Sequence, residues 1–89
     1  MSLPLDRVSG AEALSDHLCT HLALAGHYHT ALTNLAQTLC QRIGEVDARA
    51  PMEFWRLLQG LHYGGALSTG SLAQLELQLS DLVPDWRRP

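Results

Sequence analysis

The sequence predicts an all-α protein, a small four-helix bundle built from two helical hairpins. Apolar residues make up 46% of the 89 residues and are mostly Leu and Ala. Residues that favour strands are scarce, since the β-branched aliphatic residues are Val8, Ile43, Val46 and Val83 alone. The leucines recur at spacings of three and four, which indicates amphipathic helices. A chain of this length forms one domain, here residues 1–89, with a thin core.

The first helix is expected over about residues 10–25. Ser9 and Glu12 have the spacing of a capping box, in which the hydroxyl and the carboxylate satisfy amides at the start of a helix. Pro4 argues against a regular helix in residues 1–8. One apolar face is predicted to comprise Ala11, Leu14, Leu18, Leu22 and Ala25.

Gly26 is expected to end the first helix, and a second helix is predicted over about residues 28–46. The inward residues of this second helix are expected to be Leu32, Leu35, Leu39 and Ile43. The apolar periodicity also continues through Gly26, so one long helix that pairs with a second copy as a coiled coil is an alternative. A Gly inside a helix costs about 1 kcal/mol relative to Ala, which favours the break.

The third helix is expected over about residues 51–63. Pro51 suits a first helical turn, and Glu53 is favourable at the positive end of the helix. Its buried face is predicted to comprise Phe54, Leu57, Leu58 and Leu61.

A glycine-bearing connection leads to the fourth helix, which is expected over about residues 71–83. Ser71 and Gln74 repeat the capping-box spacing, and Pro84 ends the helix before a tail at residues 84–89. The apolar face of this helix is predicted to comprise Leu72, Leu75, Leu79 and Leu82.

Charge and composition exclude several classes of function. The net charge is −3 and the chain contains no Lys, so it has no basic stripe that could bind nucleic acid. The first ten residues lack the apolar run of a secretory signal, which favours a cytoplasmic location. The uncharged residues 17–41 include several His, Thr, Asn and Gln side chains, and these argue against a membrane span.

Two long segments, residues 17–41 and residues 57–75, contain no Asp, Glu, Lys or Arg. A loss of charge with hydrogen-bonding groups retained is typical of the centre of a protein interface. The alternative is that the first two helices are simply the most enclosed pair of the bundle. If these segments bind another protein or a second copy, aromatic residues are the expected anchors. The candidates are Tyr28, Phe54, Trp55 and Trp86.

Clustered histidines suggest a second hypothesis, a helical sensor that responds to a metal or a ligand. His17 and His21 are four residues apart and would lie on one helix face, a spacing that can hold zinc. No residue nearby completes a familiar metal signature, so no cofactor is expected. Ser68 or Ser71 with His62 and Asp81 shows no spacing that specifies a nucleophile and its base. The chain is therefore expected not to be an enzyme.

Residues 14–39 resemble a helical hairpin of the tetratricopeptide repeat family. Gly26, Tyr28, Ala31 and Leu35 match the turn glycine, aromatic, alanine and large apolar positions of that repeat, and Leu18 and Leu22 suit its first helix. The resemblance implies a non-catalytic scaffold that holds a segment of a partner, as small repeat-like chaperones do. We therefore expect a protein–protein interaction module, an adaptor, regulator or chaperone that buries an apolar helix of its partner.

Overall fold

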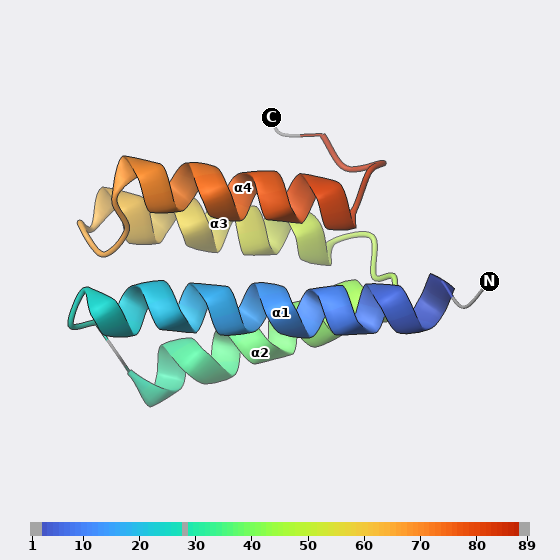
Figure 1. Ribbon diagram of the computed structural model, residues 1–89, viewed down its shortest axis with the longest axis horizontal. Helices are drawn as coiled ribbons and strands as arrows, with labels where there is room; N and C mark the ends of the chain where they lie inside the picture. The colour runs from blue at the N-terminus through green and yellow to red at the C-terminus, as the bar shows by residue number, and fades with distance from the viewer. Residues whose placement is uncertain (1–2, 28, 88–89) are drawn as a thin grey trace.

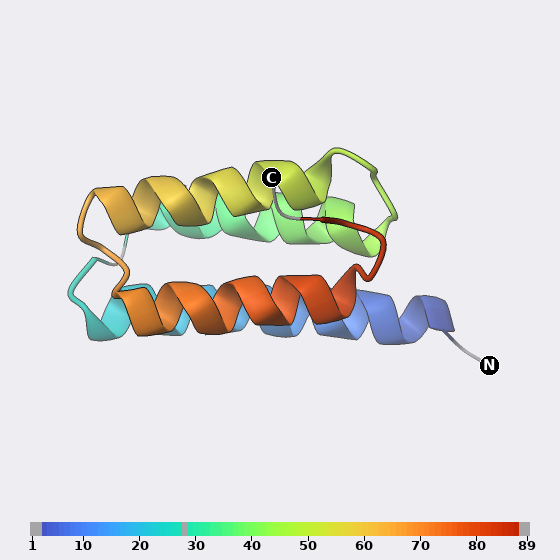
Figure 2. The ribbon, with the colours of Figure 1, turned by 90° about the horizontal axis from the view of Figure 1, so that it is seen from above.

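Four α-helices run alternately up and down in a computed structural model, which describes residues 3–27 and 29–87 (Figure 1). The helices are α1 (Leu3–Leu24), α2 (Thr30–Gly44), α3 (Ala50–Tyr63) and α4 (Thr69–Leu82). The hairpin of α1 and α2 forms one layer and the hairpin of α3 and α4 forms the other. Contacts run around a square, from α1 to α2, α3, α4 and back to α1 (Figure 2). The predicted all-α bundle of two hairpins is confirmed.

The core lies between the two layers and is made mostly of the predicted apolar stripes. Phe54 is fully buried at its centre, surrounded by leucines from the other helices. The predicted residues that are fully or almost fully buried are Ala11, Leu14, Leu18, Leu22, Leu39, Ile43, Phe54, Leu58, Leu75 and Leu79.

The buried face of α2 differs from the prediction. Leu35 is 45% exposed, whereas Ala36 and Cys40 are buried in the core. Small side chains at these two positions let α2 lie close to α1, so the helix is rotated away from the leucine stripe that the spacing predicted. Ala25 is also exposed, because α1 ends one residue before it.

The start of α1 was predicted wrongly, since the helix begins at Leu3 and continues through Ser9. Pro4 falls in the first turn of α1. Backbone amides in a first turn have no carbonyl partner within the helix, so a proline there removes no hydrogen bond. Two contacts hold these early turns against α2: Arg7 Nε donates to the carbonyl oxygen of Ile43 at 2.7 Å, and Val8 lies over Gly44. Tertiary contact therefore outweighs the capping signal at Ser9.

The start of α4 was also predicted wrongly, because the N-cap residue lies three residues before the predicted Ser71. Ser68 is the N-cap residue, and its side chain accepts a hydrogen bond from the backbone amide of Ser71 at 3.1 Å. The cap residue is a serine, as expected, but it is Ser68, the last residue of the connection between α3 and α4. The connection from α3 to α4 is correspondingly shorter than the sequence suggested.

The chain turns at Gly26, so α1 and α2 are separate helices rather than one long helix. Gly26 has a φ of +79°, and the amide of His27 donates to the carbonyl oxygen of Leu22 at 2.8 Å. This is a Schellman motif, in which a residue in the left-handed conformation ends the helix. The expected start of α2 at residue 28 lies outside the described residues, and α2 as described begins at Thr30.

The two hairpin turns, residues 25–29 and 64–68, lie at the same end of the bundle, and the α2–α3 turn lies at the other (Figure 2). This follows from the up-and-down order of the helices. Both cysteines are free, Cys19 half-buried and Cys40 buried. Within the described part of the chain, no helix is long and apolar enough to span a membrane.

Candidate functional site

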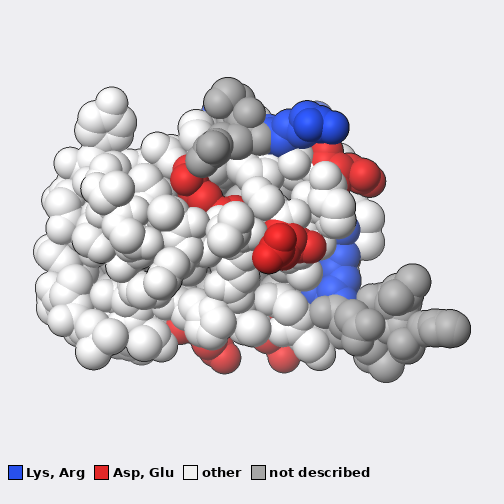
Figure 3. Space-filling view, turned by 45° about the horizontal axis from the view of Figure 1, so that its top comes forward, with Lys and Arg blue, Asp and Glu red and all other residues white. Residues whose placement is uncertain are grey.

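The two charge-free segments of the sequence meet at one end of the molecule. Residues 17–27 and 29–41 supply the end of α1 and most of α2, and residues 57–75 supply the end of α3 and the start of α4. We call this surface the charge-free end. Figure 3 shows it as a wide area without Asp, Glu or Arg, with the charged side chains gathered toward the opposite end.

Large apolar side chains project from the charge-free end. Tyr63, the last residue of α3, is 92% exposed, and Leu24, the last residue of α1, is 83% exposed. Leu35 on α2 adds a third, less exposed group. Around them, the surface residues His29, Asn34 and Thr38 offer hydrogen-bonding groups without formal charge.

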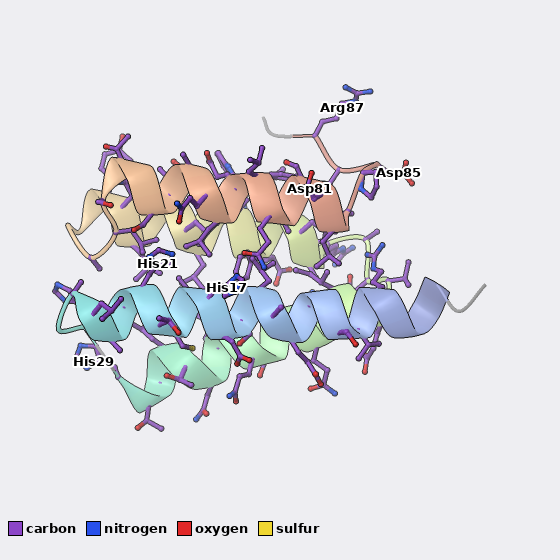
Figure 4. All side chains as sticks on the ribbon, in the orientation of Figure 1. His17, His21, His29, Asp81, Asp85 and Arg87 are labelled. Atoms are coloured by element: carbon purple, nitrogen blue, oxygen red, sulfur yellow. The ribbon has the colours of Figure 1, made fainter. Side chains whose placement is uncertain are left out.

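Histidines at the charge-free end link α1 to α4. His17 Nδ1 is hydrogen bonded to Gln78 Oε1 at 2.8 Å, and His21 Nδ1 is hydrogen bonded to the hydroxyl of Ser71 at 3.0 Å (Figure 4). The Ser71 hydroxyl also accepts a hydrogen bond from the Ser68 hydroxyl at 3.1 Å. These contacts give both histidines a structural role at the seam between the two hairpins.

Ser71 lies against His21 rather than His62. His62 Nδ1 is instead hydrogen bonded to the carbonyl oxygen of Leu67 at 2.9 Å, which fastens the connection between α3 and α4. The grouping of Ser68 or Ser71 with His62 and Asp81 is thus not assembled as a nucleophile, base and acid, because each serine hydroxyl is used in the α4 cap or the α1–α4 link.

No group of three or more His, Cys, Asp or Glu side chains in residues 3–27 and 29–87 is placed to hold a metal ion. His17 and His21 are both directed from α1 toward α4, whereas His29 lies beyond the turn (Figure 4). Binding of a metal by His17 and His21 stays a prediction that metal titration would test.

Three of the four predicted aromatic anchors, Phe54, Trp55 and Trp86, are described by the structure, and they do not share one exposed surface. Tyr28 lies outside the described residues. Phe54 is fully buried, as the apolar stripe of α3 predicted, and it is therefore not an exposed anchor. Trp55 and Trp86 are half-buried and adjacent, with ring centroids 6.5 Å apart.

The tryptophan pair is fixed partly by hydrogen bonding to α4. Trp55 Nε1 donates to Glu76 at 2.8 Å, and Gln59 donates to the same carboxylate oxygen at 2.7 Å. Trp86 Nε1 is buried and has no hydrogen-bond partner among the described residues. The pair attaches the C-terminal tail to α3, and contact of Trp55 or Trp86 with a partner stays a prediction.

Leu24 and Tyr63 were missed by the sequence reasoning, although a signal for each was present. Both precede a glycine turn and fall off the apolar stripe of their own helix, so neither can face the core. Large apolar residues in such positions, inside charge-free segments, are candidates for contact with another molecule.

Charged groups at the opposite end form an ion-pair network. Arg42 Nε lies 2.9 Å from Asp47, and Arg42 Nη1 lies 2.7 Å from Glu53. The backbone amide of Arg49 also donates to Asp47, and together with Arg42 it lowers the pKa of the Asp47 carboxyl. The Arg42 hydrogen bond lowers the pKa of Glu53 as well. This network fastens the α2–α3 turn.

The fold and the surface together define a class, a small up-and-down helical bundle with one charge-free end. Comparisons with models of known protein families, with curated proteins and with solved structures found no match to this chain. The tetratricopeptide-like resemblance of residues 14–39 therefore stays a prediction.

Proposed function

We propose that this protein is a non-catalytic protein-binding module that covers an uncharged, apolar segment of a partner with its charge-free end. One observation carries the proposal: two segments far apart in the sequence, both without formal charge, lie at the same end of the bundle, where Leu24 and Tyr63 are exposed. A helix face directed to water alone commonly carries Glu, Lys and Arg.

The composition of the charge-free end matches that of an interface core. Interface cores are depleted of charged residues and enriched in aromatic residues, and a polar rim surrounds them. Tyr63 offers a large contact area at a small cost in side-chain entropy, and its hydroxyl can hydrogen bond to a partner. Neighbouring His, Thr and Asn side chains can pair with the backbone of a bound segment, so binding would not leave polar groups buried and unpaired.

The partner in this proposal is an apolar helix of another protein or the same surface of a second copy. Burial of apolar area would supply the driving force, at about 25 cal/mol per Å² before the costs of association are subtracted. An adaptor, regulator or chaperone would use such a surface in the same way.

Two glutamate substitutions test the proposal. In the double variant Leu24→Glu/Tyr63→Glu, two charges enter the charge-free end at positions that are exposed and outside the core. We expect the wild-type chain either to self-associate in sedimentation experiments or to retain one specific partner after crosslinking in its native cells. The double variant should lose that association because a partner would have to bury two carboxylates.

Leu77→Glu is the matched control, since Leu77 is 66% exposed on α4 beyond the charge-free segments. This variant should keep the partner or the self-association. Circular dichroism and thermal unfolding of all three proteins would establish that each is folded. The proposal fails if the wild-type chain is a monodisperse monomer that retains no specific protein, or if both variants lose the association equally.

A further inference from the structure

A groove separates α1 from α2 and shares only Gln37, Cys40 and Gln41 with the charge-free end. It has a volume of about 570 Å³. Small residues line it from both helices: Ala11 and Ser15 from α1, and Cys40 and Gly44 from α2. Because these side chains are short, the groove has room for side chains of another molecule.

The rim of the groove is acidic. Glu12 and Asp16 line it from α1, and Glu45 lines it from the residue that caps α2. All three are exposed, and no Arg is among the described residues that line the groove. A surface that carries three carboxylates and no basic side chain attracts a cationic partner and repels an acidic one.

The negative potential reaches the floor of the groove. Burial is the main cause that raises the pKa of the Cys40 thiol to about 12, and Coulombic interactions with Cys19 and with the Asp16 carboxylate add to it. The Asp16 carboxylate is thus close enough to influence a group buried between the two helices. The same carboxylate that disfavours a thiolate at Cys40 would attract a cation that enters the groove.

Ser15 provides an independent observation. Its side chain is only 5% exposed, and its hydroxyl has no hydrogen-bond partner among the described residues. The hydroxyl would donate to Cys40 if the thiol ionised, but at neutral pH the thiol keeps its proton. A buried hydroxyl without a partner is costly, and a bound donor that reached it would remove this cost.

We propose that the groove between α1 and α2 binds a basic amphipathic helix of a second protein. Arg or Lys stems of that helix would lie along the exposed side chain of Val8, and their charged heads would pair with the rim carboxylates. Long basic side chains bury their methylene stems in this way while the heads stay near water. An apolar helix at the charge-free end and a basic helix in the groove would make the protein an adaptor between two partners.

A synthetic helical peptide of about 16 residues, with an Ala/Leu stripe flanked by Arg, is the probe for this proposal. Its binding to the full chain would be measured by fluorescence anisotropy. In the double variant Glu12→Gln/Asp16→Asn, we expect the dissociation constant to rise about tenfold or more, because two rim charges are lost without a change in side-chain size. A peptide with Gln in place of Arg should bind at least as weakly to the wild-type chain.

Asp81→Asn/Asp85→Asn is the charge-matched control, since these carboxylates lie on α4 and the tail, away from the groove (Figure 4). We expect this variant to bind the Arg peptide within about twofold of wild type. A second test uses Gln41→Arg, which places a cation of the chain itself inside the groove and should also weaken binding. Circular dichroism would check that each variant is folded.

Three results would overturn the proposal. The first is no binding of the Arg peptide at millimolar concentration, and the second is equal weakening in the groove and control variants, which would mean attraction to net charge alone. The third is self-association of the chain that disappears in Glu12→Gln/Asp16→Asn, which would make a second copy the occupant. None of these results depends on Leu24 or Tyr63, so this proposal and the proposed function fail separately.

Discussion

Val46 occupies the position at the end of α2 that Gly65 occupies at the end of α3. Gly65 has a φ of +83° and Val46 a φ of +63°. In both turns the amide of the next residue donates to the carbonyl oxygen five residues back, at 2.8 Å from Ala66 to Leu61 and at 3.0 Å from Asp47 to Arg42. Both are Schellman motifs, but only one has the residue type that the left-handed conformation favours.

Replacing Val46 with Gly should therefore stabilise the protein. The left-handed conformation costs an L-residue about 1–2 kcal/mol, and the larger backbone entropy that Gly loses on folding offsets part of the gain. We expect the free energy of unfolding in urea to rise by about 1 kcal/mol. The exposed Val46 side chain contributes little packing, so Val46→Ala, which keeps a Cβ atom, should gain much less. Equal gains in both variants would show that backbone strain is not the cause.

Gly26 and Gly60 should respond to Ala in opposite directions. A Cβ atom would meet nothing within 4 Å at either position, so sterics with the rest of the protein are matched. Gly60 lies inside α3, where Ala should raise the free energy of unfolding by about 1 kcal/mol. Gly26 has a positive φ, and Ala there should lower it by a similar amount. Stabilisation by Gly26→Ala would instead support one long helix through this turn.

Cys40 should make stability fall at alkaline pH. Burial raises the pKa of its thiol from 9.0 to about 12, so the unfolded chain releases a proton above pH 9 that the native chain retains. The contribution is complete below pH 9 and is lost as pH rises toward 12. Urea unfolding at about pH 10.5 should show a loss of up to about 2 kcal/mol.

Cys40→Ala is the test of this assignment and Cys19→Ala its control. The alkaline loss should disappear in the first variant and persist in the second, apart from the small contribution of Cys19 to the Cys40 pKa. In the wild-type chain, a thiol reagent at neutral pH should modify the half-buried Cys19 well before the buried Cys40. Modification of both thiols at the same rate would contradict the burial of Cys40.

Arg42 should protect the α2–α3 turn at neutral pH but not in acid. The Arg49 amide and Arg42 lower the pKa of Asp47, and Arg42 lowers the pKa of Glu53, so the stability that these carboxylates contribute is present above their ordinary pKa values and is lost as pH falls. Arg42→Gln should unfold at a lower temperature than wild type at pH 7, with a difference that shrinks toward pH 3. Arg56→Gln removes the same charge from the exposed face of α3 and should show a smaller effect at pH 7.

The number of helices and most of the core could be predicted because the leucine spacing on α1, α3 and α4 is regular. The predictions failed where contacts between distant residues decide the outcome. Arg7 and Val8 extend α1 by contacts with the end of α2, and α2 turns Leu35 outward so that its small residues can approach α1. Neither contact leaves a local signal in the sequence.

The candidate site was predicted in part. The two charge-free segments are visible in the sequence, but only the up-and-down topology places them at one end. Phe54 lies on the apolar stripe of α3, so the spacing predicted its burial correctly, and that burial removes it from the candidate anchors at the surface. Leu24 and Tyr63 are exposed because they fall off the apolar stripes of their helices, and the glycine turns that follow place both at the charge-free end.

The direction of the helices has a practical consequence for assembly and display. The N-terminus of α1 and the C-terminus of α4 both lie at the end of the bundle opposite the charge-free end (Figure 1). A fluorescent protein, a surface anchor or a neighbouring domain could be joined before α1 or after α4 while Leu24 and Tyr63 stay directed away from it. The same molecule could thus be presented in many copies on a particle, with every copy offering its uncharged surface to the solution.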